Sequence, residues 1–236
     1  MAAKYLAPQF IAGSIIMRIL ITAGGTREYI DPVRFISNAS TGKMGYALAR
    51  AALIAGHKVT LITTIENLKL KTQNSKLLKV FNVETAAEMF RAVQKHFPRC
   101  DCLIMAAAVA DYTPARPAKT KIRRQNKPLT IKLKPTPDIA RWAGRHKRGQ
   151  RHKGTKAQRQ IIVGFALEDK NLQVNAERKL KDKNLDMIIA NTPVAIGADK
   201  TIVLIKTPER KWLKLPKASK TIVARKIISL MEADKK

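Results

Sequence analysis

The segment ISNASTGKMG, residues 36–45, combines an amide, hydroxyl side chains, two glycines and a lysine just before an alanine-rich helical pattern. Small residues let a ligand approach the backbone, and a helix N-terminus offers free N–H groups and a positive dipole end to an anion. About twenty residues separate Gly24 and Gly25 from that helix, which is longer than a plain connection needs. The pattern therefore predicts a loop that binds a phosphate group, although a glycine-rich segment of this kind can also be a tight turn.

This loop differs from the common glycine-rich phosphate motifs. A P-loop requires glycine where Ser37 stands and a hydroxyl residue where Met44 stands. The first strand is not followed by the G-x-G-x-x-G of dinucleotide-binding folds, and no tyrosine has a lysine four residues later, as a short-chain dehydrogenase requires. An NAD(P)-dependent reductase is therefore only an alternative hypothesis of the same fold class.

Apolar strands and helical patterns alternate along the chain. Near-continuous apolar strands separated by helices indicate a mainly parallel sheet that is covered on both faces. The sequence thus predicts an α/β fold, a Rossmann-like doubly wound three-layer domain at residues 17–236 that follows an N-terminal arm at 1–16. The expected strands are 18–23, 58–64, 77–83, 101–110, 160–166 and 185–191, with a hairpin at 201–216, and the expected helices are 45–57, 85–97, 171–184 and 217–233.

Two basic segments interrupt this alternation. Residues 112–133 are expected to form a flap or arm, with an exposed strand or hairpin arm in the alternating LTIKLK at 129–134. Residues 144–160 contain seven Lys or Arg, no acid and no apolar period, which predicts a solvated basic insertion. The net charge of +29 attracts polyanions, so a nucleic-acid-binding protein is the second hypothesis. Aromatic residues are only 5% of the chain, which is few for base-stacking surfaces.

Other features favour a cytoplasmic protein. No run reaches the roughly 20 apolar residues that a membrane span needs. Cys100 and Cys102 lack the spacing of a zinc site, so we expect ordinary reduced thiols and no metal site built by the protein.

Six ordered motifs, which together extend from Met17 to about residue 230, resemble the phosphopantothenate–cysteine ligases (phosphopantothenoylcysteine synthetases). The motifs are ITAGGTREYIDPVRFISNASTGKMGYALA, AAAVADYTP, KIRR, TPDIA, VGFALE and KLKDKNLDMIIAN. The resemblance implies a ligase that joins 4'-phosphopantothenate to L-cysteine through an acyl-cytidylate, giving 4'-phosphopantothenoylcysteine in coenzyme A biosynthesis.

The resemblance also implies the ligands and the assembly. KIRR resembles the KIKK-type flap of bacterial members that use CTP, so CTP is expected rather than ATP, with Mg²⁺ carried by the triphosphate and no flavin. No flavin-dependent decarboxylase segment precedes these motifs, as in the stand-alone bacterial form, so a separate decarboxylase is the expected functional partner. Members pair through the arm, and a homodimer is therefore expected.

Site residues follow from the resemblance position by position. Asn38 and Lys121 match catalytic residues, the first because its amide can donate to a carbonyl oxygen, the second because it sits on a flap that closes over the reacting phosphate. Without the resemblance, Asn38 could be a helix cap, Arg34 a surface ion pair and Lys121 part of a solvated loop. The substrate-binding residues are expected to be Arg34, Ala107, Ala108 and Asp111. The nucleotide-binding residues are expected to be Gly25, Ser40, Gly42, Gly45, Pro137, Asp138, Ile139, Ala140, Phe165, Lys179 and Lys183.

Overall fold

A central sheet organises the computed structural model, which describes residues 15–66, 75–148 and 159–234. The sheet has the order β12-β11-β10-β9-β6-β1-β4-β5, and six of its strands are parallel. These are β1 (Arg18–Ala23), β4 (Lys58–Thr63), β5 (Leu78–Asn82), β6 (Cys102–Met105), β9 (Ile161–Leu167) and β10 (Met187–Asn191). The predicted hairpin adds β11 (Lys200–Lys206) and β12 (Leu213–Ser219) in antiparallel orientation.

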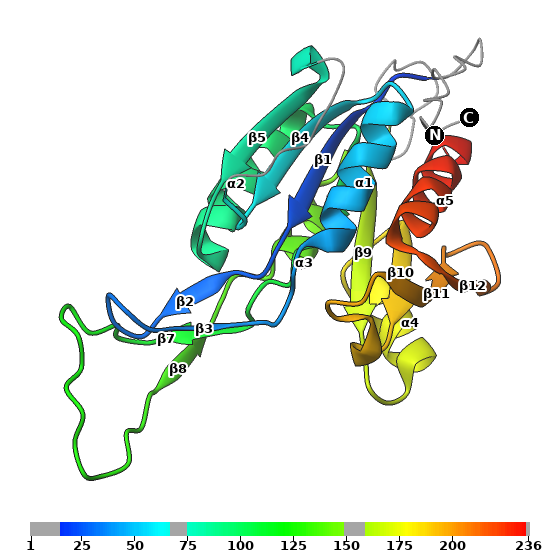
Figure 1. The fold of residues 1–236 in the computed structure, drawn as a ribbon. Coiled ribbons are helices and arrows are strands. Elements are labelled where there is room, and N and C mark those ends of the chain that lie inside the picture. Colours follow the sequence, from blue (N-terminus) through cyan, green and yellow to red (C-terminus); the bar gives the residue numbers. More distant parts are fainter. Residues whose placement is uncertain (1–14, 67–74, 149–158, 235–236) are drawn as a thin grey trace, which may run out of the picture.

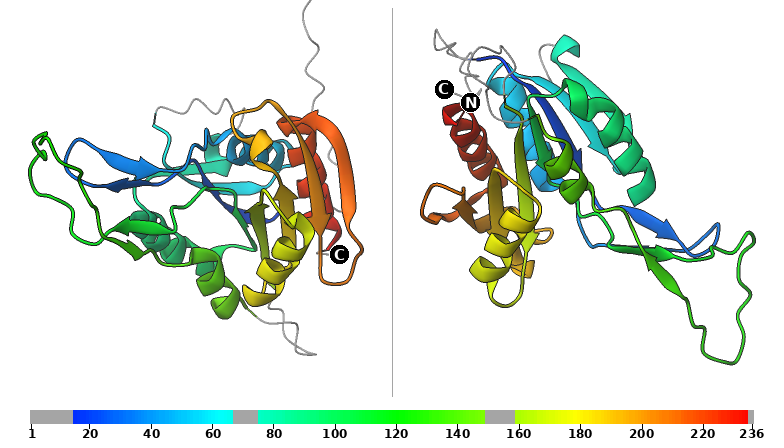
Figure 2. Two further views of the ribbon diagram at one scale, coloured as in Figure 1. Left: turned by 90° about the horizontal axis from the view of Figure 1, so that it is seen from below. Right: turned by 180° about the vertical axis from the view of Figure 1, so that it is seen from behind.

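Helices cover both faces of the sheet (Figures 1 and 2). Successive side chains of a strand point to opposite faces, so Ile19 and Ile21 pack with α1 (Lys43–Ile54) and α5 (Lys220–Ala233). Leu20 packs in the second core, which contains α2 (Ala86–His96), α3 (Ile139–His146) and α4 (Leu172–Asp182). The predicted doubly wound three-layer α/β architecture is confirmed.

The start of α2 agrees with the predicted capping residues, whereas the start of α5 differs from the prediction. Thr85 caps α2 and forms a capping box with Glu88, as the sequence predicts. The last helix begins at Lys220 rather than at residue 217, because β12 continues to Ser219 and the Ser219 hydroxyl caps the helix. Short 3-10 helices occur at η1 (Ser75–Leu77), η2 (Phe97–Arg99) and η3 (Pro193–Ala195).

A projecting arm is built from two short hairpins (Figure 1). The long loop after β1 contains β2 (Arg27–Tyr29) paired with β3 (Phe35–Ser37). The strand predicted at 101–110 ends at Met105, and β7 (Tyr112–Pro114) then pairs with β8 (Leu133–Pro135). The exposed strand expected at 129–134 is thus represented by β8, which has three residues and begins only at Leu133. The residues between β7 and β8 form the flap.

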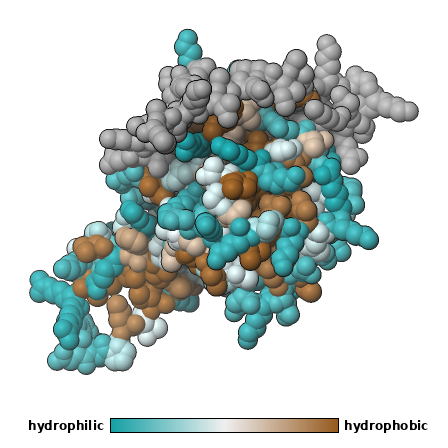
Figure 3. All heavy atoms as spheres, turned by 45° about the vertical axis from the view of Figure 1, so that its right-hand side comes forward, coloured by the Kyte–Doolittle hydropathy of each residue, from teal (hydrophilic) through white to brown (hydrophobic). Residues whose placement is uncertain are grey.

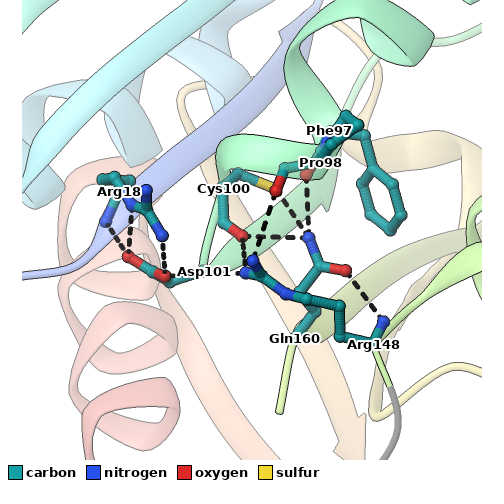
Figure 4. A network of polar contacts seen from close by, with 7 residues as sticks. All are labelled: Arg18, Phe97, Pro98, Cys100, Asp101, Arg148 and Gln160. Carbon is teal, nitrogen blue, oxygen red and sulfur yellow. Dashed lines mark hydrogen bonds and ion pairs between the residues drawn. The ribbon is translucent and has the colours of Figure 1, made fainter. Parts of the chain in front are cut away.

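The basic insertion predicted at 144–160 begins later than expected. Gly144 and His146 belong to α3, whose buried side carries Ala143 and Gly144, and residues 149–158 lie outside the described residues. Where the chain leaves α3, the Arg148 guanidinium donates to the Cys100 carbonyl at 2.8 Å and the Arg148 N–H donates to Gln160 Oε1 at 2.9 Å (Figure 4). These bonds fix both described ends of the insertion beside the starts of β6 and β9.

Cys100 and Cys102 are buried and form no disulfide. Burial raises the pKa of the Cys100 thiol to about 12, so this thiol stays protonated and is a poor nucleophile. In the described parts of the chain, the helices are all too short or too polar to cross a bilayer.

Candidate functional site

A cavity of about 580 Å³ lies at the carboxyl ends of the parallel strands. Its wall is contributed by residues 38–44 after β1, 105–109 and 111 after β6, 136–140 at the start of α3, and 164, 165, 167 and 168 in and after β9. Lys179, Lys183, Asn191, residues 195–197 and Lys220 complete the wall. Open α/β sheets bind ligands at this edge, where loops from neighbouring strands converge.

Most of the predicted site residues meet in this wall, although they come from distant parts of the sequence. They are Asn38, Ser40, Gly42, Ala107, Ala108, Asp111, Pro137, Asp138, Ile139, Ala140, Phe165, Lys179 and Lys183. The cavity therefore brings together the segments expected to contact the nucleotide and those expected to contact the substrate. Gly25, Gly45, Arg34 and Lys121 lie outside its wall.

Asn38 joins the loop after β1 to the loop after β6. Its Nδ2 donates to the Ala108 and Val109 carbonyls, both at 3.2 Å. Asn38 does not cap α1, because Gly42 occupies the N-cap position with a φ of 69°. The amide is thus held between two loops at the cavity wall, where it can exchange one long hydrogen bond for a ligand oxygen.

Gly25 and Gly45 act through packing rather than through the cavity wall. A Cβ at Gly25 would lie 2.7 Å from the Asn38 carbonyl oxygen, so glycine here lets the two parts of the loop approach. A Cβ at Gly45 would lie 2.5 Å from the Ala23 Cβ, so Gly45 lets α1 pack closely on β1. The phosphate contact expected from these two glycines stays a prediction.

The N-terminus of α1 faces the cavity through Gly42, Lys43 and Met44. Within the described part of the chain, no side chain caps this end, and the first turn of the helix has no acidic residue. The uncapped N–H groups and the positive end of the helix dipole therefore favour an anion in the adjacent part of the cavity.

A lysine pair and an aspartate form another part of the wall. Lys179 Nζ donates to the Phe165 carbonyl at 2.6 Å, and its pKa is lowered by burial and by the nearby charge of Lys183. Asp138 accepts from the Arg141 N–H at 3.0 Å as the cap of α3 and pairs with Lys183 at 2.9 Å. Burial raises the pKa of Asp138, but these donors outweigh it and leave the pKa low. The Lys183 contact is one that an anionic ligand could replace.

Arg34 and Lys121 lie on the arm. Arg34 forms an ion pair with Asp31 and donates to the Ile122 carbonyl at 2.7 Å. Arg34 thus forms an ion pair inside the arm with the buried Asp31, and its expected contact with the substrate phosphate stays a prediction. Lys121 is exposed on the flap. Neither side chain lines the cavity.

Several wall residues were missed by sequence reasoning. Lys43 Nζ donates to the Gly197 carbonyl at 3.1 Å and to Asp199 Oδ1 at 2.7 Å, and Lys220 Nζ donates to the Ala195 carbonyl at 3.2 Å. Burial and the neighbouring charge of Lys43 lower the pKa of Lys220. Lys43 is part of the glycine-rich segment and could have been found there. Lys220 has no comparable local signal, because only the fold brings the start of α5 to the cavity.

Residues 16–234 match the family described as DNA/pantothenate metabolism flavoprotein C-terminal domain. The chain belongs to this family. It is 39% identical over 237 residues to the coenzyme A biosynthesis bifunctional protein CoaBC of Bacillus subtilis, covering 99% of this chain and 55% of that protein. It is also 46% identical over 181 residues to a cysteine/cysteine sulfinic acid decarboxylase of an unknown prokaryote, covering 77% of this chain and 47% of that protein. The chain thus spans about half the length of these curated relatives.

Solved structures place the fold within the same family. The C-terminal domain of a CoaBC protein superposes with a TM-score of 0.74 at 36% identity, covering 92% of this chain and 94% of that one. A Cab2 mutant in complex with phosphopantothenate-cysteine has a TM-score of 0.71 at 20% identity, covering 92% and 86%, which shows likeness of fold. Among the described residues, no group of three or more His, Cys, Asp or Glu is arranged to hold a metal ion.

Proposed function

We propose that the chain is a phosphopantothenate–cysteine ligase that forms 4'-phosphopantothenoylcysteine through an acyl-cytidylate. The observation that carries this proposal is the cavity in which Asn38, the uncapped end of α1 and the segments around Asp138 and Lys179 meet, in a chain of this family. Such a cavity can hold a nucleotide beside a second substrate.

The reaction requires two displacements, because a carboxylate is a poor acceptor for an amine. In the first, a carboxylate oxygen of 4'-phosphopantothenate attacks the α-phosphorus of CTP and pyrophosphate leaves. In the second, the cysteine amine attacks the acyl carbonyl, CMP leaves and the amine proton is lost. Both steps develop negative charge on oxygen, which preorganised N–H donors and cations stabilise.

The cavity supplies such groups in suitable places. The N-terminus of α1 and Lys43 are suited to the phosphates, and Asn38 Nδ2 is suited to the acyl oxygen of the intermediate. Lys121 would join the reacting phosphate when the flap closes over the cavity. Mg²⁺ would enter on the triphosphate and neutralise its charge, with Asp111 as the carboxylate best placed to contact it, because Asp138 is held by Lys183 and Glu168 by Asn175.

The test measures pyrophosphate release from CTP or ATP with 4'-phosphopantothenate and Mg²⁺, each with and without L-cysteine. Release that requires phosphopantothenate, is faster with CTP and ends in the cysteine amide supports the proposal. Asn38→Ala should still release pyrophosphate but accumulate the acyl-nucleotide, with the second step at least about a hundredfold slower. Absence of release with either nucleotide would refute the ligase.

A further inference from the structure

The backbone of Ile122, the residue after Lys121, is held at both its N–H and its carbonyl by the turn between β2 and β3. Asp31 Oδ2 accepts from the Ile122 N–H at 3.1 Å. Arg34 Nη2 donates to the Ile122 carbonyl at 2.7 Å and also to Asp31 Oδ2 at 2.5 Å. The flap is also held at Ala118, whose N–H donates to the Ile30 carbonyl at 2.8 Å. Beyond it, among the described residues 119–131, Ile122 is the one that hydrogen-bonds to the rest of the molecule.

The two oxygens of Asp31 have separate tasks. Oδ1 accepts from the Val33 and Arg34 N–H groups, both at 2.9 Å, and so forms the turn between β2 and β3. Oδ2 accepts from the Arg34 guanidinium and from the flap at Ile122. Oδ2 is thus the atom through which the turn holds the flap.

Burial and charge make this contact strong. The Asp31 side chain is 0% exposed, whereas that of Arg34 is 44% exposed. The Arg34 guanidinium holds the pKa of Asp31 far below its usual range against the opposing effect of burial, and the N–H groups of Val33, Ile122 and Arg34 add to this. The carboxylate therefore remains ionised, and releasing Ile122 would remove one of the donors that a buried charge requires.

We propose that Asp31 is a positioning residue that anchors the flap at Ile122 and so sets where Lys121 is presented to the reacting phosphate. The inference rests on the proposed function for the role of Lys121. Adjacent Cα atoms are about 3.8 Å apart, so fixing Ile122 limits the directions in which the exposed Lys121 can extend. The flap would then close about a fixed point beside its lysine rather than as a free loop.

The Asp31→Asn variant tests the contact with Ile122 while it keeps the hydrogen bonds that form the turn between β2 and β3. The side-chain oxygen of the new amide can still accept from Val33 and Arg34, but its NH₂ group would face the Arg34 guanidinium and the Ile122 N–H, which are donors. The matched control is Asp234→Asn, because Asp234 also pairs with an arginine, Arg210, at 3.0 Å but lies at the end of α5. Thermal unfolding of both variants verifies that the fold is retained.

The first readout is trypsin cleavage of the native protein, with each bond quantified by mass spectrometry. Cleavage at Lys121–Ile122 is expected to accelerate about tenfold in Asp31→Asn relative to Lys170–Asn171, which lies outside the arm, the factor that corresponds to one lost hydrogen bond to a charged group. The control should match the wild type at both bonds. Equal relative cleavage in Asp31→Asn and wild type would refute the anchor, whether or not the protein is a ligase.

The second readout is a double-mutant cycle on the acyl-nucleotide step. In the wild-type background, Asp31→Asn should lower kcat about tenfold and change the KM for CTP less. In a Lys121→Ala background, adding Asp31→Asn should lower kcat by less than about twofold, because the lysine that it positions is already absent. If the loss of kcat in the double variant equals the product of the losses in the two single variants, Asp31 does not act through Lys121. Wild type without ligase activity would refute the proposed function and the catalytic part of this inference, while the cleavage pattern would still decide on the anchor.

Discussion

At the scale of single residues, Lys179 places a positive charge in the cavity wall at a cost to the stability of the folded state. Burial, and then the charge of Lys183, lower the pKa of Lys179 below its ordinary 10.5. The folded state therefore releases this proton at a lower pH than the unfolded state does. Below the folded pKa the charged lysine destabilises the fold, and this penalty is relieved as the pH rises from the folded pKa toward 10.5.

Lys179→Met should consequently be more stable than wild type by a margin that is largest near neutral pH and shrinks as the pH rises. The same variant should raise KM for the nucleotide about tenfold or more, because a cation near the phosphates is lost. Urea unfolding between about pH 7 and about pH 10 gives the first quantity and steady-state kinetics the second. Lys181→Met, exposed on the same helix, is the control. A constant stability difference across this range would contradict the prediction.

Many wall residues could be named from the sequence because they lie in the motifs that resemble the phosphopantothenate–cysteine ligases. Asn38, Asp138 and Phe165 were named in this way, and the fold then brings them to one cavity wall. Gly25 and Gly45 were harder to assign, because a glycine needed for close packing looks the same in sequence as one that contacts a ligand. Lys220 was missed, because its approach to the cavity depends on how α5 packs beside α1.

At the scale of elements, the strands of the main sheet were predictable because each is a continuous apolar run. The pairing of β2 with β3 was not predicted, and a strand or hairpin was expected near β8 without its partner. Strands of three residues are stabilised by pairing with another segment and carry no period of their own. Helix α3 was not among the predicted helices, because its basic residues hide its apolar period. Its buried positions Ile139, Ala140, Ala143 and Gly144 recur on one face of a helix, and its basic side chains Arg141 and Arg145 are exposed.

The contact between α3 and α4 supports a second prediction. The Asn184 side chain donates to the Gly144 carbonyl at 2.9 Å, and a Cβ at Gly144 would collide with the Lys183 carbonyl. Gly144→Ala should therefore force the helices apart and destabilise the protein by about 1–3 kcal/mol, as overpacking does. It should also weaken nucleotide binding, because Asp138 and Lys183 pair across the same contact. Urea unfolding against Arg145→Ala, an exposed neighbour, measures the effect, and equal stability would contradict it.

A third prediction concerns the buried His57, which links the start of β1 to α5. Its Nδ1 accepts from the Met17 N–H at 3.3 Å, and its Nε2 lies 3.0 Å from Glu232. Burial lowers the pKa of His57 below 6.5, although Glu232 opposes this. The unfolded state then binds a proton first as the pH falls, so the contribution of the neutral imidazole to stability is present above pH 6.5 and is lost as the pH falls toward the folded pKa.

Wild type should therefore lose more stability between about pH 7 and about pH 5 than His57→Asn, whose amide oxygen can still accept from Met17. Thermal or urea unfolding at several pH values measures the slope. His146→Asn, at the end of α3, should keep the wild-type slope. A His57→Asn slope equal to that of wild type would show that another group is responsible.

At the scale of the whole molecule, two surface properties concern partners. The net charge of +29 keeps non-specific nucleic-acid binding as an open alternative, and such binding would weaken steeply with salt. The exposed apolar residues of the arm indicate a contact surface. Figure 3 shows hydrophobic side chains gathered on the projecting arm, where the exposed large apolar residues are Val33, Phe35, Ile36, Tyr112, Leu129 and Leu133.

A soluble protein rarely exposes so many large apolar side chains on one projection without covering them. We therefore expect a second copy of the chain to pack on the arm. Light scattering should give about twice the 26.3 kDa of one chain. Leu133→Asp, which places a charge on β8, should give the mass of one chain, because burying an unpaired carboxylate costs more than the contact provides.

Val174→Asp is the matched control, because Val174 is 68% exposed on α4, away from the arm. It should keep the mass of the dimer. If Leu133→Asp also lowers ligase activity while Val174→Asp does not, the arm contact and the flap beside it contribute to the site. A wild type with the mass of a single chain would contradict this prediction.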